Sequence, residues 1–147
     1  MKVTLPARLA LPPPHNPTER SRILAVDFAA NHQGREYDLP EVEYLVSLWI
    51  DAEMPVFCTD KVMFLVQEQS PGVAEFHSVN GGTAKDLSAG VNQLLAALAV
   101  NYQFACTYYD NPRVNDLLKH ADFPVTCPRL DGGQDRTFEA KFDLRSL

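Results

Sequence analysis

The chain has 147 residues, of which 46% are hydrophobic and 22% are charged, and its formal net charge is -6 at pH 7. This length fits one domain with a real hydrophobic core, so we expect residues 1–147 to form a single domain. The acidic balance argues against direct nucleic-acid binding, and no apolar run approaches the ~20 residues that span a membrane.

The cysteines Cys58, Cys106 and Cys127 lie far apart and show no Cys-x-x-Cys spacing. We therefore predict neither a metal site nor a disulfide framework. Prolines interrupt the apolar stretch at the N-terminus, so no signal peptide is predicted. A reducing cytoplasmic location is the expectation.

The N-terminal third is predicted to hold an arm and two helices. Residues 1–16 form a proline-rich strand or arm, with the strand at 3–11. Asn16 before Pro17 marks the start of a first helix. Asp38 with Glu41 marks the start of a second helix, which should pack on the core. Its apolar stripe is formed by Val42, Leu45, Val46 and Trp49.

The middle of the chain is predicted to hold an antiparallel hairpin and a long helix. Short strands are expected at 56–59 and 62–66, and a further strand at 73–79. Pro71 and Gly72 suit the central positions of a type II turn, which would join the last two strands. Thr83 suits a helix N-cap with Asp86 three residues later. The apolar face of that helix is Leu87, Val91, Leu94, Leu95 and Leu98.

A further strand at 103–109 and a helix from Asn111 complete a β-α-β-α unit. Its two strands should be parallel neighbours. A closing antiparallel pair is expected at 124–127 and 137–144. The residues predicted to be largely buried are Trp49, Leu94, Leu98, Phe104, Phe123 and Phe142.

The fold class is therefore α/β (α+β), with a mixed central sheet and the order β-α-α-β-β-β-α-β-α-β-β. This order, and the unit from Val73 to Phe123, resemble the GNAT superfamily of N-acetyltransferases. That superfamily has Gln/Arg-x-x-Gly-x-Gly/Ala at its third helix, where Lys85, Ser88 and Gly90 stand here. It also has a Tyr seven residues after an Asn; counted from Asn111, this chain has Leu118 there.

The resemblance implies a single GNAT-like domain whose two parallel strands diverge towards their C-terminal ends. It also implies an acetyl-CoA site at the third helix, where backbone N–H groups would hold the pyrophosphate. Lys85 is the only basic residue in that loop. The implied cofactor-binding residues are Val79, Lys85, Ser88, Ala89, Gly90 and Asn111. The order of elements in the second half also resembles podovirus acetyltransferase-like proteins of the internal virion protein A type.

Three residues are the candidate catalytic groups. Glu75 and His77 share the strand face where GNAT enzymes place a general base, although a solvated hairpin face explains them equally. Tyr108, or its neighbour Tyr109, would replace the missing acid, or else serve as an aromatic core or rim residue.

The departures at Ser88 and Leu118 favour a non-catalytic reading. On this reading the chain is a structural component of a phage virion or assembly, binds other proteins, and holds no cofactor. The alternative is an N-acetyltransferase that uses acetyl-CoA, and a second alternative is a regulatory module that binds acyl-CoA. We expect acetyl-CoA to bind weakly or not at all.

Overall fold

A computed structural model describes residues 15–31, 37–109, 113–126 and 138–145. The elements of these residues, in chain order, are α1 (Pro17–Asn31), α2 (Leu39–Asp51), β1 (Val56–Cys58), β2 (Val62–Ser70), β3 (Val73–Asn80), α3 (Ala84–Leu98), β4 (Phe104–Tyr109), α4 (Val114–Leu118), β5 (Val125–Thr126) and β6 (Phe138–Asp143). The predicted strand at 3–11, the arm through residue 14, Asn111 and Cys127 lie outside the described residues.

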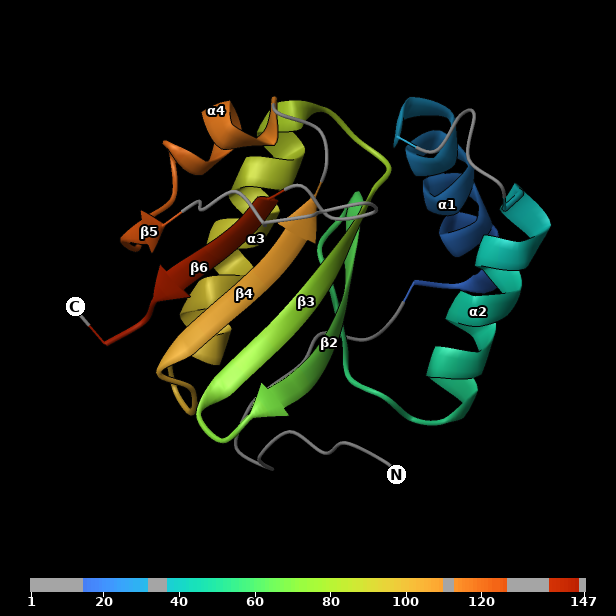
Figure 1. Cartoon of the computed structure of the whole chain (residues 1–147). Coiled ribbons are helices and arrows are strands. Elements are labelled where there is room, and N and C mark those ends of the chain that lie inside the picture. The colour runs from blue at the N-terminus through green and yellow to red at the C-terminus, as the bar shows by residue number, and fades with distance from the viewer. Residues whose placement is uncertain (1–14, 32–36, 110–112, 127–137, 146–147) are drawn as a thin grey trace.

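The strands form one mixed sheet in the order β1-β2-β3-β4-β6-β5 (Figure 1). Only the β3–β4 pair is parallel among the described pairings; the others are antiparallel. The predicted hairpin is confirmed, and Gly72 at its turn has φ +80, a conformation that glycine adopts without strain. The α+β class and the mixed sheet are confirmed.

The parallel pair separates along its length. Its register runs through three residue pairs and ends at Glu75 opposite Cys106. β3 continues to Asn80 and β4 continues to Tyr109 without further pairing between these two strands. The predicted divergence is confirmed, and we call the opening beyond the Glu75–Cys106 pair the β3–β4 fork.

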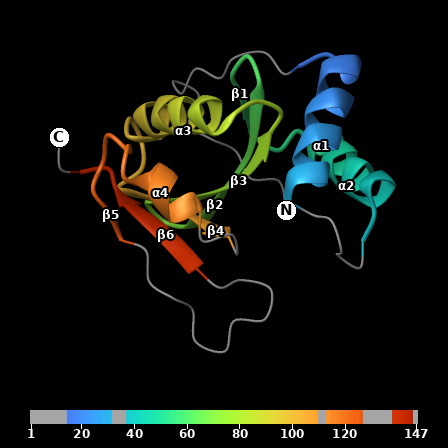
Figure 2. The same cartoon turned by 90° about the horizontal axis from the view of Figure 1, so that it is seen from above.

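Helices cover both faces of the sheet. α3 runs behind β3, β4 and β6 in Figure 1, and α4 lies beside it in Figure 2. The alternation of strand side chains sends Ala74 and Phe76 into the core beneath α3. The opposite face receives α1 and α2, which bury Ile23, Leu24 and Val46 against Met63 and Val79.

The helix starts follow the predicted caps. Asn16 Oδ1 accepts from the Glu19 N–H at 2.8 Å, and Asp38 Oδ1 accepts from the Glu41 N–H at 3.0 Å. Thr83 and Asp86 form a complete capping box at the start of α3. Local spacing alone was enough to place these three starts.

The predicted burial was right for one group of residues and wrong for another. Leu94, Leu98, Phe123 and Phe142 are buried, with exposed fractions between 0% and 8%. Trp49 and Phe104 are only half-buried. Trp49 Nε1 donates to the Pro55 carbonyl at 3.0 Å, and the Phe104 ring lies beneath the side chains of Lys141 and Arg145. Both rings therefore lie outside the two clusters of buried core residues.

The stripe predicted for α2 is also partly wrong. Val46 is 4% exposed, whereas Leu45 is 63% exposed. Leu45 belongs to an exposed apolar group on α2 together with Tyr44 and Leu48. The reason is that α2 packs along a single narrow side, against α1 and the sheet.

No helix in the described part of the chain is long and apolar enough to cross a bilayer. Within the same residues, His, Cys, Asp and Glu side chains do not gather in groups of three that would hold a metal ion.

Candidate functional site

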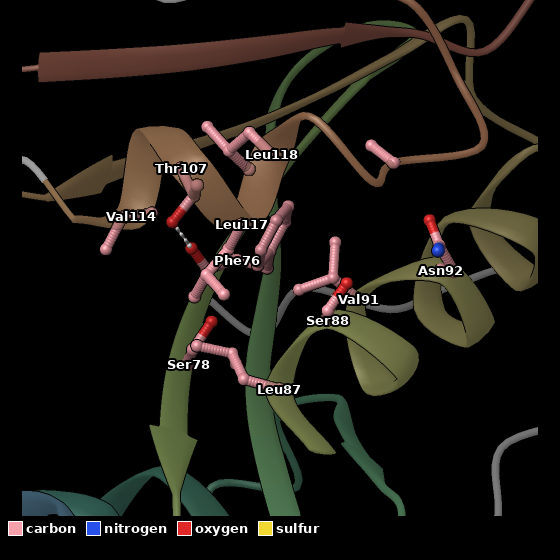
Figure 3. Close-up of a pocket in the computed structure, with 11 residues that line it drawn as sticks. Phe76, Ser78, Leu87, Ser88, Val91, Asn92, Thr107, Val114, Leu117 and Leu118 are labelled. Carbon is pink, nitrogen blue, oxygen red and sulfur yellow. Dashed lines mark hydrogen bonds between the residues drawn. The ribbon is translucent and has the colours of Figure 1, made fainter. Parts of the chain in front are cut away.

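A pocket lies on the α3 side of the β3–β4 fork, between the two strands, α3 and α4 (Figure 3). Its empty space is about 410 Å³, counting the part open to solvent. Most of its lining is apolar, and hydroxyl groups come from Ser78, Ser88 and Thr107. The other lining residues are Phe76, Leu87, Val91, Asn92, Val114, Leu117, Leu118 and Ala121.

Thr107 closes the base of the fork. Its Oγ1 donates to the Phe76 carbonyl at 2.8 Å, one residue beyond the last ladder pair (Figure 3). Asn92 fixes the far wall, because its Nδ2 donates to the His120 carbonyl and its Oδ1 accepts from the Asp122 N–H. The pocket is therefore held open between α3 and α4 by hydrogen bonds across the fold.

A polar cluster lies on the opposite face of the same strands. Glu75 is only 6% exposed, and its carboxylate accepts from Gln67 Nε2 at 3.1 Å and from Gln69 Nε2 at 3.0 Å. His77 Nε2 lies 3.0 Å from Glu75 Oε2, and the His77 side chain is 40% exposed. We call Gln67, Gln69, Glu75, His77 and Tyr108 the Glu75 cluster. A buried carboxylate held by three nitrogen atoms orients an imidazole that solvent can reach.

Tyr108 joins this cluster through its hydroxyl, which accepts from Gln69 Nε2 at 3.0 Å. Burial raises the pKa of Tyr108, with a hydrogen bond to Glu139 also raising it. Burial likewise raises the pKa of the Cys106 thiol to about 11, assisted by the charges of Glu75 and Glu139. Tyr108 and Cys106 thus stay protonated at neutral pH, and Cys106 is not a nucleophile.

The pocket and the Glu75 cluster both lie beside the fork, on opposite faces of the sheet. The pocket reaches it from the α3 side through Phe76 and Thr107. The Glu75 cluster borders it on the other face, because Glu75 belongs to the last ladder pair and His77 follows two residues later. The pocket and the carboxylate–imidazole pair therefore lie on opposite faces of the same part of the two strands.

Comparisons with known proteins bear on the fold. No protein-family model matches the chain, and no curated protein matches its sequence. Among solved structures, it is similar to yncA, a putative acetyltransferase from Salmonella typhimurium with its cofactor acetyl-CoA, at 11% identity and a TM-score of 0.53, over 87% of this chain and 91% of that one. The chain has a GNAT-like fold.

A second solved structure leads to the same fold. A spermidine N-acetyltransferase SpeG chimera from Vibrio cholerae and hSSAT aligns at 11% identity with a TM-score of 0.57, over 88% of this chain and 94% of that chain. At this identity, the likeness is one of fold. The resemblance to podovirus proteins stays a prediction.

The predicted cofactor-binding residues do not all lie in the pocket. Ser88 lines the pocket, whereas Lys85 and Ala89 are exposed on the first two turns of α3. Val79 packs in the core beside α1, because residues 76 and 78 face the pocket and a strand alternates. Asn111 lies outside the described residues.

Gly90 has a packing reason for being a glycine. A Cβ atom built there would lie 3.2 Å from two ring carbons of Phe64. Glycine therefore lets α3 approach β2 closely, at a position away from the pocket lining. Leu118, at the position of the superfamily's Tyr, does line the pocket and is 7% exposed.

The predicted catalytic residues Glu75, His77 and Tyr108 do lie together. Tyr109 lies on the other face, where its hydroxyl donates to Asn115 Oδ1 and its ring stacks on Phe138. Sequence reasoning missed Gln67 and Gln69, although their spacing of two on the strand paired with β3 was a usable signal.

Two further groups were missed at the loop between β3 and α3. Buried Asp27 of α1 accepts from the Asn80 N–H at 3.0 Å and so anchors the end of β3. Its place three and four residues after Leu24 and Ile23, on the buried helix face, was the available signal. Arg22 and Lys61 reach the same loop through the fold, and nothing in the sequence pattern placed them there.

Proposed function

We propose that the chain is an N-acyltransferase that moves an acyl group from a pantetheine thioester to an amine. The observation that carries this proposal is the β3–β4 fork, which has an apolar pocket on one face and the Glu75–His77 pair on the other. The GNAT-like fold, shared with a structure described with acetyl-CoA, supports the same reading. It reverses the preference that we drew from the sequence.

The pocket would hold the donor's arm. Its lining comes largely from apolar side chains of α3 and α4, which suit the uncharged chain of a pantetheine. The hydroxyls of Ser78 and Ser88 offer hydrogen bonds to amide groups of that arm. The thioester supplies an electrophilic carbonyl carbon, and the arm's direction would bring that carbon to the fork.

His77 would act as the general base. It takes a proton from the acceptor nitrogen as the new C–N bond forms and the C–S bond breaks, and the sulfur leaves with the bonding electron pair and then gains a proton. Glu75 would orient the imidazole and stabilise its protonated form across the 3.0 Å contact. Thiols have pKa values near 8.5, so the loss of the Tyr acid at Leu118 is tolerable.

The test is a transfer assay with the full chain. Acetylated thioester donors are incubated with a panel of primary amines, and thiol release is followed together with the mass of the acylated amine. His77→Ala should lower the rate about 10²- to 10⁴-fold. His120→Ala, which removes an exposed imidazole at the end of α4, should leave it unchanged.

The proposal fails if no donor and amine pair gives product, or if the two histidine variants behave alike. Glu75→Gln adds a discriminating arm, since it keeps the side chain's size while removing the charge beside His77. It should lower the transfer rate although the imidazole is still present, because the positive charge that develops on His77 loses its carboxylate partner.

A second candidate function rests on a different surface. Tyr44, Leu45 and Leu48 are 63%, 63% and 46% exposed, and they lie within two turns of α2. Exposed apolar groups of this kind favour protein binding, as the predicted assembly component requires. Light scattering tests this by measuring the molar mass of the chain and of Leu45→Ser, each alone and with the proteins that co-purify with it. If neither protein shows a larger mass than its monomer in any of these samples, the binding surface is not supported.

A further inference from the structure

The start of α3 carries a carboxylate where the rest of the donor would emerge. Leu87 and Ser88 of α3 line the pocket, and the capping box lies one turn before them. A donor arm that leaves the pocket along α3 therefore meets this first turn. The exposed N–H groups of a helix start would normally attract the negatively charged end of the donor.

Asp86 already fills this position. Its Oδ2 accepts from the Thr83 N–H at 2.8 Å and from Thr83 Oγ1 at 3.0 Å. The carboxylate also lies over Gly82, where an added Cβ would be 2.4 Å from Oδ2. The hydrogen bonds from Thr83 lower the pKa of Asp86, so the group is charged at neutral pH. A negative charge therefore already lies beside the N-cap of α3, over Gly82.

Nearby cations offset this charge only in part. Arg22 is paired with Glu19 at 3.3 Å. The positive charge of Lys61 attracts the Asp86 carboxylate and helps to lower its pKa. Lys85 is exposed to water on the first turn, where solvent screens its charge as it screens the solvent-accessible carboxylate of Asp86. The diphosphate of coenzyme A would bring two further negative charges to this turn, beside a phosphate on its ribose.

We propose that Asp86 is a specificity-determining residue that excludes the coenzyme A diphosphate, so that the donor is a pantetheine thioester without it. The inference rests on the proposed function for its thioester chemistry. The apolar pocket accommodates the uncharged arm, and the first turn of α3 repels a diphosphate that follows it. A phosphate monoester at the end of the arm also carries about 1.5 to 2 negative charges at pH 7, so it meets the same repulsion, and only the arm without a phosphate avoids it.

Three acetylated donors test this: acetylpantetheine, acetyl-4′-phosphopantetheine and acetyl-CoA. Calorimetry gives their dissociation constants for the full chain and for Asp86→Asn, which keeps an oxygen acceptor for the Thr83 N–H and so preserves the cap. Asp116→Asn, which removes an exposed carboxylate paired with Lys119, is the matched control. Circular dichroism confirms that each variant is folded.

The unaltered chain should bind acetyl-CoA no more tightly than acetylpantetheine. Asp86→Asn should tighten acetyl-CoA about tenfold or more, because one like charge leaves a few ångströms from the diphosphate. Acetylpantetheine should change less than about twofold, since it carries no charge. Asp116→Asn should alter neither donor, and added salt should narrow the difference between the two proteins.

The inference is overturned if the unaltered chain prefers acetyl-CoA about tenfold or more and Asp86→Asn leaves that preference intact. It is also overturned if none of the donors binds to either protein. If Asp86→Asn shifts the binding as expected while no amine is acylated by any donor, the proposed function falls and the role of Asp86 stands.

Discussion

The two faces of β3 and β4 differ in what holds them together. On the α3 face, Ala74, Phe76 and Ala105 are packed in a dry core, and Phe76 meets the rings of Phe64 and Phe142 at 5.9 Å and 6.0 Å. On the other face, Glu75 is almost as buried, but its carboxylate is held by hydrogen bonds from two glutamine side chains of the neighbouring strand β2.

Within this one pair of strands, the packed face mainly stabilises the fold, whereas the other face carries the groups that could act chemically. The packed face gains free energy from apolar area and tolerates no change of shape. The Glu75 cluster gains little net stability from each hydrogen bond, but it orients groups that can move a proton. We therefore expect substitutions in the packed core to change the free energy of unfolding most, and substitutions in the Glu75 cluster to change activity most. Phe76 also lines the pocket, so its substitution should change both.

The largest effect should come from Phe76→Ala. This variant should lose about 3 to 5 kcal/mol of unfolding free energy, because the cavity lies among rings that cannot collapse into it. Chemical denaturation measures this loss. Phe104→Ala, which removes a half-buried ring from the opposite face, should lose clearly less. Equal losses would contradict the contrast between the two faces.

A second effect depends on pH. The pKa of the Cys106 thiol is raised from 9.0 to about 11 by burial, so the unfolded chain releases this proton at lower pH than the folded chain. The stabilising contribution is complete below pH 9 and is lost as the pH rises to about 11. The loss should be on the order of 2 kcal/mol at the upper end.

Denaturation curves at several pH values compare the chain with Cys106→Ala, in which this part of the slope should disappear. Tyr102 and Tyr108, whose pKa values are also raised by burial, continue to contribute at higher pH in both proteins. Identical slopes between pH 9 and 11 in the two proteins would mean that the thiol is not enclosed as the structure has it.

Glu75→Ala should have an intermediate effect on stability. Removing the carboxylate leaves the amides of Gln67 and Gln69 without their acceptor, at a cost of about 1 to 3 kcal/mol. Glu75→Gln should cost less, because an amide oxygen remains to accept. If Glu75→Ala leaves the free energy of unfolding unchanged, the cluster is a solvated surface, as the simpler interpretation of the sequence allowed.

The smallest effect should come from Thr107→Val, which is nearly isosteric. It removes the hydroxyl that donates to the Phe76 carbonyl at the base of the fork. We expect a loss of about 0.5 to 1.5 kcal/mol by chemical denaturation. Thr107→Ser should retain the bond, and Thr126→Val on exposed β5 should change little. A larger loss from Thr126→Val than from Thr107→Val would rule out a special role for the fork hydroxyl.

Much of the fold could be predicted because its signals are local. The caps at Asn16, Asp38 and Thr83 need only a polar side chain and an N–H three residues away. The turn at Gly72 needs only a residue that tolerates positive φ. The parallel pairing of β3 and β4 followed from the long helix between them, since a crossover of that length returns a strand in the same direction.

The amphipathic stripes were a less secure guide. Leu45 and Trp49 lie at helical spacing with Val46, yet only Val46 is enclosed. A stripe shows which side of a helix is apolar, and the neighbouring elements decide how much of that side they cover. The same limit applies to Phe104, which the fold places under two cationic side chains at the sheet margin.

The sequence by itself determined the order of the described elements, their caps and turns, the parallel pairing of β3 with β4, and the presence of Glu75 and His77 on one strand face. Only the tertiary structure decided what surrounds them. Gln67 reaches Glu75 across a strand pair, and Arg22 reaches the Gly81 carbonyl from 59 residues away. The physical reason is that backbone geometry is set by near neighbours in the chain, whereas charge, burial and acidity depend on whatever the fold brings close.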